Sequence, residues 1–310
     1  MKLNTPKFWQ DKNIISLFLF PLSFITQFFN FVKKFVHKKT FKIKTICIGN
    51  IYIGGTGKTS LAIEIHNILK KKFKTVFIKK NYLNQKDELK LLKKSGRVIS
   101  TDDRLNSLNI AEKKKFEVAI LDDGFQQKNI NYDLKILCFN SIKGIGNGMV
   151  LPSGPLRESF NEINNCDLIF INGANKNNKL VKKLKYINKK INIFKTEYLP
   201  TNLKKFSTKK NFLMFCGIGN PHEFENTLLK YKFTIKKKFI YPDHYQISDK
   251  DINEIKDFAK KEKLTIITTE KDYLRLHKNQ QMGIKFLKIK LKIKNLIKLK
   301  KILFKVNEKS

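Results

Sequence analysis

One segment of the sequence has the residue types and spacing that bind the phosphates of a nucleotide. It follows an apolar run typical of a strand and precedes a run typical of a helix. Backbone N–H groups at the start of that helix would cradle the phosphates, Lys58 would reach the β- and γ-phosphates, and Thr59 would hold Mg²⁺. The strict pattern has glycine at the first position, so this loop is a variant. Its eight residues are Tyr52, Ile53, Gly54, Gly55, Thr56, Gly57, Lys58 and Thr59.

Two aspartates stand at the end of a second apolar run. Asp122 and Asp123 follow residues 118–121 directly. A carboxylate at the carboxyl end of a strand, facing a phosphate-binding loop, is typical of a Mg²⁺ site in nucleotide-binding proteins. Asp-Asp-Gly is also common in turns, so these aspartates indicate a Mg²⁺ site only in combination with the phosphate-binding loop. The two segments together predict a Mg²⁺ site in which either aspartate serves.

Two other groups of residues have side chains suited to acid–base chemistry. Asp87 and Glu88 are adjacent in a polar connection, where carboxylates are usually solvated. Asp243 and His244 follow a predicted strand and Pro242. They form either a functional Asp/His pair or a turn with an exposed histidine, and the residues alone leave both alternatives open.

The charge of the chain is large but nearly all of it is lysine. The 310 residues carry a formal net charge of +38, and 64 of them are Lys or Arg. The only arginines are Arg97, Arg104, Arg157 and Arg275. Arginine is the preferred residue for reading phosphate and guanine, so we expect a lysine-biased surface and no nucleic-acid partner. The four cysteines lie far apart in apolar runs, which predicts buried free thiols and a cytoplasmic location for the body of the protein.

An uncharged apolar run lies near the N-terminus, at residues 14–32, and lysines follow it. No small-residue cleavage site follows, which argues against a signal peptide. Three alternatives remain: a helix anchored on the membrane surface, a membrane-spanning helix, and a helix packed on the protein's own core. Trp9 and the flanking lysines favour the membrane surface.

The rest of the chain alternates between strand-like and helix-like runs, which predicts parallel sheets covered by helices. The fold class is therefore α/β, with a P-loop NTPase-type parallel sheet domain, a smaller C-terminal α/β domain and an N-terminal apolar helix. We expect an N-terminal membrane-associated helix at 1–40, a P-loop kinase domain at 41–207 and a C-terminal α/β domain at 208–310. Residues 296–306 have helical apolar spacing and are expected to pack on the C-terminal sheet, with a membrane-contact helix as the less favoured alternative. The predicted strands are 42–48, 75–78, 118–121, 134–139, 168–171, 191–194, 212–216, 233–241, 264–268 and 284–293.

The order of these motifs resembles that of the tetraacyldisaccharide 4'-kinases, the lipid A 4'-kinases of Gram-negative bacteria. The resemblance extends from about residue 6 to about residue 276, and its blocks are specific as a set. After the apolar N-terminal helix they read GNIYIGGTGKT, KDEL, LDDGFQ, GNGMVLPSGPLRE, CGIGNP, PDHY and TTEKD.

The resemblance implies an enzyme that transfers the γ-phosphate of ATP to the 4'-hydroxyl of an acylated glucosamine disaccharide 1-phosphate, forming lipid IVA in lipid A biosynthesis. It implies ATP and Mg²⁺ as cofactors, and a membrane surface at the cytoplasmic face of the bacterial inner membrane. Carried over by match, Asp87 is the base toward the sugar hydroxyl, His244 assists it, and Lys58 completes the catalytic set. The implied metal residues are Thr59, Glu88, Asp122 and Asp123.

The sequence departs from the family's pattern at several positions. Lys80 stands where the family commonly has arginine, Gln127 replaces a histidine, and the loop before Asp87 is shorter. The alternative function is a membrane-associated regulatory P-loop ATPase of the partitioning type. That class has lysine before the two glycines of the loop, where this chain has Ile53. A basic nucleic-acid-binding protein is a third alternative, which the scarcity of arginine disfavours.

Overall fold

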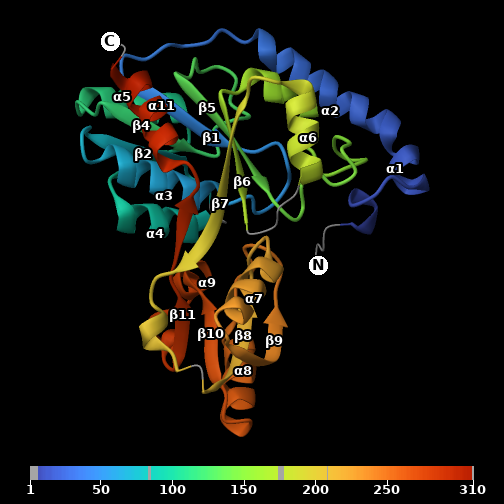
Figure 1. Cartoon of the computed structure of the whole chain (residues 1–310), viewed down its shortest axis with the longest axis vertical. Helices are drawn as coiled ribbons and strands as arrows, with labels where there is room; N and C mark the ends of the chain where they lie inside the picture. Colours follow the sequence, from blue (N-terminus) through green and yellow to red (C-terminus); the bar gives the residue numbers. More distant parts are fainter. Residues whose placement is uncertain (1–5, 83–84, 174–177, 208, 309–310) are drawn as a thin grey trace. The chain divides into compact units, whose positions relative to one another are not determined.

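The computed structural model describes residues 6–82, 85–173, 178–207 and 209–308, and within them it contains two β-sheets, of which the larger is mixed and mostly parallel and the smaller is parallel (Figure 1). Neighbouring strands pair in parallel, as the alternating pattern predicts, except at the edge of the larger sheet, where β12 lies beside β7. In order across the larger sheet, the strands are β12 (Ile289–Ile293), β7 (Asn192–Pro200), β6 (Leu168–Asn172), β5 (Leu134–Asn140), β1 (Lys44–Gly49), β4 (Val118–Asp122), β2 (Thr75–Lys80) and β3 (Val98–Thr101). Those of the smaller sheet are β11 (Ile284–Leu287), β10 (Thr265–Thr269), β8 (Asn211–Cys216) and β9 (Thr234–Ile240).

Helices connect most of the successive strands, as is usual for parallel pairing. The helices before and between strands of the larger sheet are α1 (Ile14–Phe18), α2 (Phe20–Val32), α3 (Lys58–Leu69), α4 (Lys86–Ser95), α5 (Arg104–Lys113) and α6 (Asn178–Ile187). Those of the C-terminal part are α7 (Pro221–Lys230), α8 (Asp249–Lys261), α9 (Glu270–Arg275), α10 (Lys278–Gln281) and α11 (Leu296–Glu308). Short 3₁₀ helices are η1 (Lys7–Trp9), η2 (Lys33–Phe35), η4 (Phe160–Asn165) and η5 (Leu203–Lys205).

The chain divides into two compact units, and each unit is discontinuous in sequence. The smaller unit contains residues 82–94 and 198–292, so α4 clusters with the C-terminal sheet. The larger unit contains residues 3–81, 95–197 and 293–310. Each unit therefore contains residues that are far apart along the chain. The domains predicted at 1–40, 41–207 and 208–310 are continuous in sequence, and they stay a prediction. Thr208, at the predicted boundary, lies outside the described residues.

The predicted strands are present, with two differences. The strand β3 was not predicted, because residues 98–101 are short and half-buried. Residues 284–293 were predicted as one strand, but they form β11 and β12, which belong to different sheets.

The prediction for the C-terminal helix is wrong in its packing partner. The helix α11 contacts α3 of the larger unit, and its Phe304 ring lies 6.2 Å from Phe73. Leu299 and Leu303 are fully buried there. The helical apolar period fixes which residues are buried, but it carries no information on which sheet they cover.

The N-terminal apolar run forms two helices, α1 and α2, which Leu19 separates. Pro21 lies in the first turn of α2, where a proline's missing N–H costs nothing. Within the described part of the chain, no helix combines the length and the apolarity that crossing a bilayer requires.

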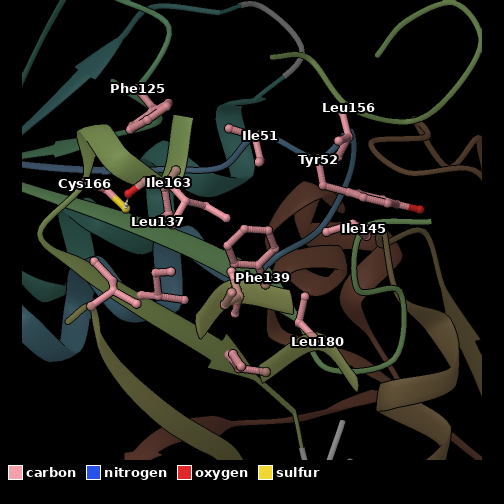
Figure 2. Packing of buried hydrophobic residues seen from close by; sticks show 14 of the residues in the cluster. Ile51, Tyr52, Phe125, Leu137, Phe139, Ile145, Leu156, Ile163, Cys166 and Leu180 are labelled. Atoms are coloured by element: carbon pink, nitrogen blue, oxygen red, sulfur yellow. Dashed lines mark hydrogen bonds between the residues drawn. The ribbon is translucent and has the colours of Figure 1, made fainter. Parts of the chain in front are cut away.

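Two apolar clusters flank the strands of the larger sheet. Figure 2 shows one of them, in which Leu137 and Phe139 of β5 pack with Ile51 and Tyr52 of the segment after β1. Ala119 and Leu121 of β4 belong to the other cluster. The loop that follows β1 is therefore anchored at its start by buried side chains.

The predicted state of the cysteines is confirmed. Cys47, Cys138, Cys166 and Cys216 are buried free thiols. Burial raises the pKa of Cys47 to about 12, so this thiol stays protonated and unreactive at neutral pH.

Candidate active site

The predicted nucleotide-binding loop lies between β1 and α3, at the carboxyl edge of the larger sheet. Gly57 precedes the first residue of α3 and has a φ of 84°, and Gly54 has a φ of 105°. Both angles lie in the left-handed region that favours glycine. These two glycines let the chain turn sharply into the helix, so the first N–H groups of α3 point out of the loop's end. This is the geometry that binds phosphate.

The first two residues of the loop contribute in a different way from the rest. The Tyr52 side chain is buried in the core, beside Leu156 in Figure 2, so only its main chain remains to face a nucleotide. The N–H of Ile53 donates to the carbonyl oxygen of Pro155 at 2.9 Å. The side-chain amide of Asn50 stabilises the loop by donating to the carbonyl oxygens of Tyr52 and Gly54.

Thr59 and Asp122 meet behind the loop, as predicted for a Mg²⁺ site. The Thr59 hydroxyl donates to Oδ2 of Asp122 at 3.0 Å. The Lys79 ammonium group, almost fully buried on β2, donates to the same oxygen at 2.8 Å. This ion pair neutralises a carboxylate that has no contact with water. The other oxygen of Asp122 is buried and has no hydrogen-bond partner.

Asp123 turns its carboxylate toward the loop lysine. Its Oδ1 lies 3.4 Å from Nζ of Lys58 and 3.5 Å from a guanidinium nitrogen of Arg157. The residue has a φ of 63°, and Arg104 donates to its carbonyl oxygen at 2.8 Å. Burial alone would raise the pKa of Asp123, but the charges of Lys58 and Arg157 outweigh burial and lower it. The carboxylate is therefore ionised beside the predicted phosphate site.

Asp87 lies in the smaller unit, at the start of α4, and it is buried rather than solvated. Arg275 donates to its Oδ2 at 2.8 Å, and Nδ1 of His244 lies 3.5 Å from its Oδ1. Burial would raise the pKa of Asp87, but the contact with His244 and the charges of Lys271 and Arg275 hold it well below its usual range. The structure thus brings together the two residues predicted as base and assistant.

The backbone of His244 lies in the left-handed region, which is strained for a residue other than glycine. Its φ is 60°, and its N–H donates to the carbonyl oxygen of Gly217 at 3.2 Å. Its other ring nitrogen, Nε2, lies 3.8 Å from Asp243. The predicted Asp/His pair therefore exists as a loose contact, and the closer carboxylate is that of Asp87.

Glu88 and Asp272 complete the charge network of the smaller unit. Nζ of Lys271 lies 2.6 Å from Oε1 of Glu88. Asp272 is fully buried and accepts hydrogen bonds from the Gly217 N–H, from Thr269 and from Arg275. Arg275 therefore bridges Asp272 and Asp87, and it fixes the start of α4 against α9.

The cationic partners of the acidic residues were not predicted from the sequence. Arg157, Arg275 and Lys79 were not predicted, although each contacts a predicted aspartate. A signal existed in the composition, because only four of the 64 basic residues are arginines. In a chain so strongly biased to lysine, an arginine marks a position that needs the planar, multiply donating guanidinium group.

The predicted metal residues divide between the two units. Thr59, Asp122 and Asp123 are in the larger unit and Glu88 is in the smaller one. Among the described residues, no group of three or more His, Cys, Asp and Glu is arranged to hold a metal ion. The donors still suit Mg²⁺, which prefers oxygen and is usually held by one or two carboxylates, phosphates and water. The unpartnered buried oxygen of Asp122 supports this fit.

Comparisons with known proteins show the family to which the chain belongs. The family model for tetraacyldisaccharide-1-P 4'-kinase matches residues 15–307. A tetraacyldisaccharide 4'-kinase from Pelagibacter ubique is 47% identical over 314 aligned positions, which cover all of both chains. A protein of the same name from Rickettsia bellii is 35% identical and covers 95% of this chain and 96% of its own.

A solved structure shows the same fold. It is LpxK from Aquifex aeolicus in complex with ATP, with a TM-score of 0.71 and 23% identity, and the match covers 94% of this chain and 99% of that one. These matches confirm the predicted family and α/β fold class, and they do not support the partitioning-type ATPase. The chain therefore belongs to the tetraacyldisaccharide-1-P 4'-kinase family, and it is a 4'-kinase of lipid A biosynthesis.

Proposed function

We propose that the chain transfers the γ-phosphate of ATP to the 4'-hydroxyl of tetraacyldisaccharide 1-phosphate, and that Asp87 accepts the proton of that hydroxyl. The observation that carries the proposal is the buried, ionised Asp87 in contact with His244. A new bond forms between the 4'-oxygen and the γ-phosphorus, and the bond from that phosphorus to the β–γ bridging oxygen breaks. ADP leaves, and the proton goes to the Asp87 carboxylate.

The larger unit holds the donor nucleotide in this scheme. The N–H groups that begin α3 and the Lys58 ammonium group bind the phosphates, while Asp123 lies next to Lys58 and Arg157 lies next to Asp123. Thr59, Asp122 and Asp123 would hold Mg²⁺, with Glu88 as a further candidate. When bound, this ion would neutralise charge on the β- and γ-phosphates.

The low pKa of Asp87 suits phosphoryl transfer. The transition state of this reaction is loose, so the attacking hydroxyl needs orientation more than early deprotonation. An ionised carboxylate accepts the hydrogen bond of the hydroxyl and takes the proton as the new bond forms. Arg275 keeps Asp87 ionised and fixes one of its oxygens, and the other oxygen faces His244.

The N-terminal helices supply the means of reaching a lipid substrate. The outward side of α1 and α2 exposes large apolar side chains, which supports a membrane-surface role for that side. They include Ile14, Leu17, Phe18, Phe24, Ile25, Phe28, Phe29 and Phe31. Lys33, Lys34 and Lys38 follow this apolar side. An apolar face flanked by lysines suits an anionic membrane surface, so we place the enzyme at the cytoplasmic face of the inner membrane.

A transfer assay tests the proposal. The purified protein is incubated with ATP labelled at the γ-phosphate and with tetraacyldisaccharide 1-phosphate, and label in the lipid product is measured. Lys58→Ala removes the cation beside the phosphates and is expected to abolish transfer, whereas Lys70→Ala, an exposed lysine at the far end of α3, leaves transfer unchanged. Wild-type turnover in Lys58→Ala would refute the role of the loop.

A further inference from the structure

In the helices α1 and α2 the apolar side chains face outward and polar side chains face the protein, the reverse of a typical surface helix. Their large apolar residues are exposed, while Ser16 and Ser23 are fully buried and Asn30 is partly buried. Ser23 and Asn30 are seven positions apart within α2, so they share one side of that helix. A helix that served only as a membrane anchor would need no such polar side. The buried hydroxyls and the amide therefore have partners worth identifying.

The Ser16 hydroxyl is bonded to the main chain of Asn13, before α1. The partners of Ser23 and Asn30 lie in one loop, residues 147–157, which we call the clasp loop. The Ser23 hydroxyl contacts the carbonyl oxygen of Val150 and the hydroxyl of Ser153, both at 2.8 Å. The Asn30 amide donates to the carbonyl oxygen of Arg157 at 2.8 Å. The polar side of α2 is thus hydrogen-bonded to the main chain and a side chain of the clasp loop.

A second set of bonds ties the clasp loop to the segment before α1. The indole N–H of Trp9 donates to the carbonyl oxygen of Pro152 at 2.9 Å. Asn147 donates through its side chain to the carbonyl oxygen of Phe8 at 3.0 Å, and through its N–H to that of Trp9 at 2.9 Å. A Cβ added to Gly146 would lie 2.4 Å from the carbonyl oxygen of Trp9. The two segments therefore approach too closely for any residue larger than glycine at this position.

The other side of the clasp loop lies against the nucleotide-binding loop. The Arg157 N–H donates to the carbonyl oxygen of Ile51 at 2.7 Å, and Tyr52 and Leu156 form a β-bridge (Figure 2). The Arg157 side chain continues from this point to Asp123 at 3.5 Å. One side of Arg157 is therefore held by the helix and the other by the nucleotide-binding loop.

We propose that Ser23 and Asn30 are positioning residues for phosphoryl transfer, which hold the clasp loop so that Arg157 stays beside Asp123 and the bound phosphates. The inference rests on the proposed function, in which Lys58 binds the phosphates and Arg157 lies beside Asp123, the partner of Lys58. It makes the membrane helix a structural part of the nucleotide site. A helix docked on a membrane by its apolar side would then brace the clasp loop with its polar side.

The test uses the full chain, with Asn30→Ala and Ser23→Ala as variants and Thr26→Ala, in the same helix, as the matched control. Transfer from γ-labelled ATP to tetraacyldisaccharide 1-phosphate is measured on vesicles of phosphatidylethanolamine and phosphatidylglycerol. Vesicle binding, the denaturant midpoint and binding of a fluorescent ATP analogue are measured alongside. We expect kcat to fall about three- to tenfold in Asn30→Ala, the equivalent of one hydrogen bond, while vesicle binding stays unchanged.

A double-mutant cycle separates positioning from a general loss of stability. In the Arg157→Met background, Asn30→Ala is expected to lower kcat no further, because the residue it positions is absent. An equal fall in both backgrounds, or a wild-type kcat in both Asn30→Ala and Ser23→Ala, overturns the proposal. If Asn30→Ala does not fold, Ser23→Ala carries the same cycle. If the wild-type chain transfers no phosphate, the proposed function fails, and binding of the ATP analogue still tests the positioning.

Discussion

Arg275 is the residue whose removal tests the electrostatic organisation of the smaller unit most severely. Its guanidinium group is 5% exposed, and it lies 2.8 Å from Asp87 and 2.8 Å from Asp272, whose side chains are 1% and 0% exposed. It also donates to the carbonyl oxygen of Gly217. Arg275→Met keeps most of the side-chain volume but leaves two buried carboxylates without their shared cation. Removing one partner of a buried ion pair costs roughly 3–5 kcal/mol, which is the loss of unfolding free energy we expect at pH 7.

The sign of the pH dependence follows from the pKa of Asp87. In the wild-type protein this pKa lies below its unfolded value, so the associated stability is present above about pH 4 and is lost as the pH falls through the folded value. Without Arg275 the pKa of Asp87 rises, and the carboxyl group is protonated at a higher pH. The stability difference between wild type and Arg275→Met should therefore be largest near pH 7 and should shrink toward pH 4.

Urea denaturation at pH 7, pH 5.5 and pH 4 measures these differences. Lys261→Met, an exposed lysine at the end of α8 in the same unit, is the matched control and should change the unfolding free energy by less than about 0.5 kcal/mol. A loss below about 1 kcal/mol in Arg275→Met at pH 7 would refute the reasoning, as would a difference that grows on acidification.

Two further predictions concern the acidic residue and the membrane side. The difference in unfolding free energy between wild type and Asp87→Asn should be constant from about pH 5 to pH 7 and should decrease below about pH 4, because the stability contributed by the ionised Asp87 is lost as the pH falls. A difference that is flat down to pH 3 in urea titrations would contradict this. Phe18→Ser combined with Phe28→Ser should weaken binding to phosphatidylglycerol-containing vesicles at least tenfold, since burying a phenylalanine contributes about 1.5–3 kcal/mol. Tyr186→Ser, which removes an aromatic ring that is 88% exposed on α6, is the control in vesicle cosedimentation, and equal losses would argue against the helices as the membrane contact.

The sequence was most informative where local pattern determines local structure. The nucleotide-binding loop was predicted from glycines whose backbone angles the structure shows at Gly54 and Gly57. Asp122 and Asp123 were predicted at the end of their strand, and they lie at the end of β4. In each case the residue type, its neighbours and its place on a parallel strand are sufficient.

Contacts between distant segments could not be predicted in the same way. Asp87 was expected to be solvated without the family resemblance, because its burial is produced by α9, almost 190 residues later, and Arg275 lies 188 positions away. The same holds for α11, whose period identifies its buried residues but not α3 as the partner. Such contacts depend on how elements pack, and a single sequence contains no local signal for packing.

The central claim is that Asp87 acts on the acceptor hydroxyl, and the most direct test is the steady-state kinetics of Asp87→Asn. With γ-labelled ATP and tetraacyldisaccharide 1-phosphate, kcat should fall at least about 100-fold, as expected for loss of a general base. Because we propose that residues of the larger unit hold the nucleotide, we expect the affinity for ATP to change less than about twofold. Asp243→Asn, which alters the partly exposed carboxylate beside His244, provides the comparison. A kcat within about threefold of wild type in Asp87→Asn would contradict the account and place the base elsewhere.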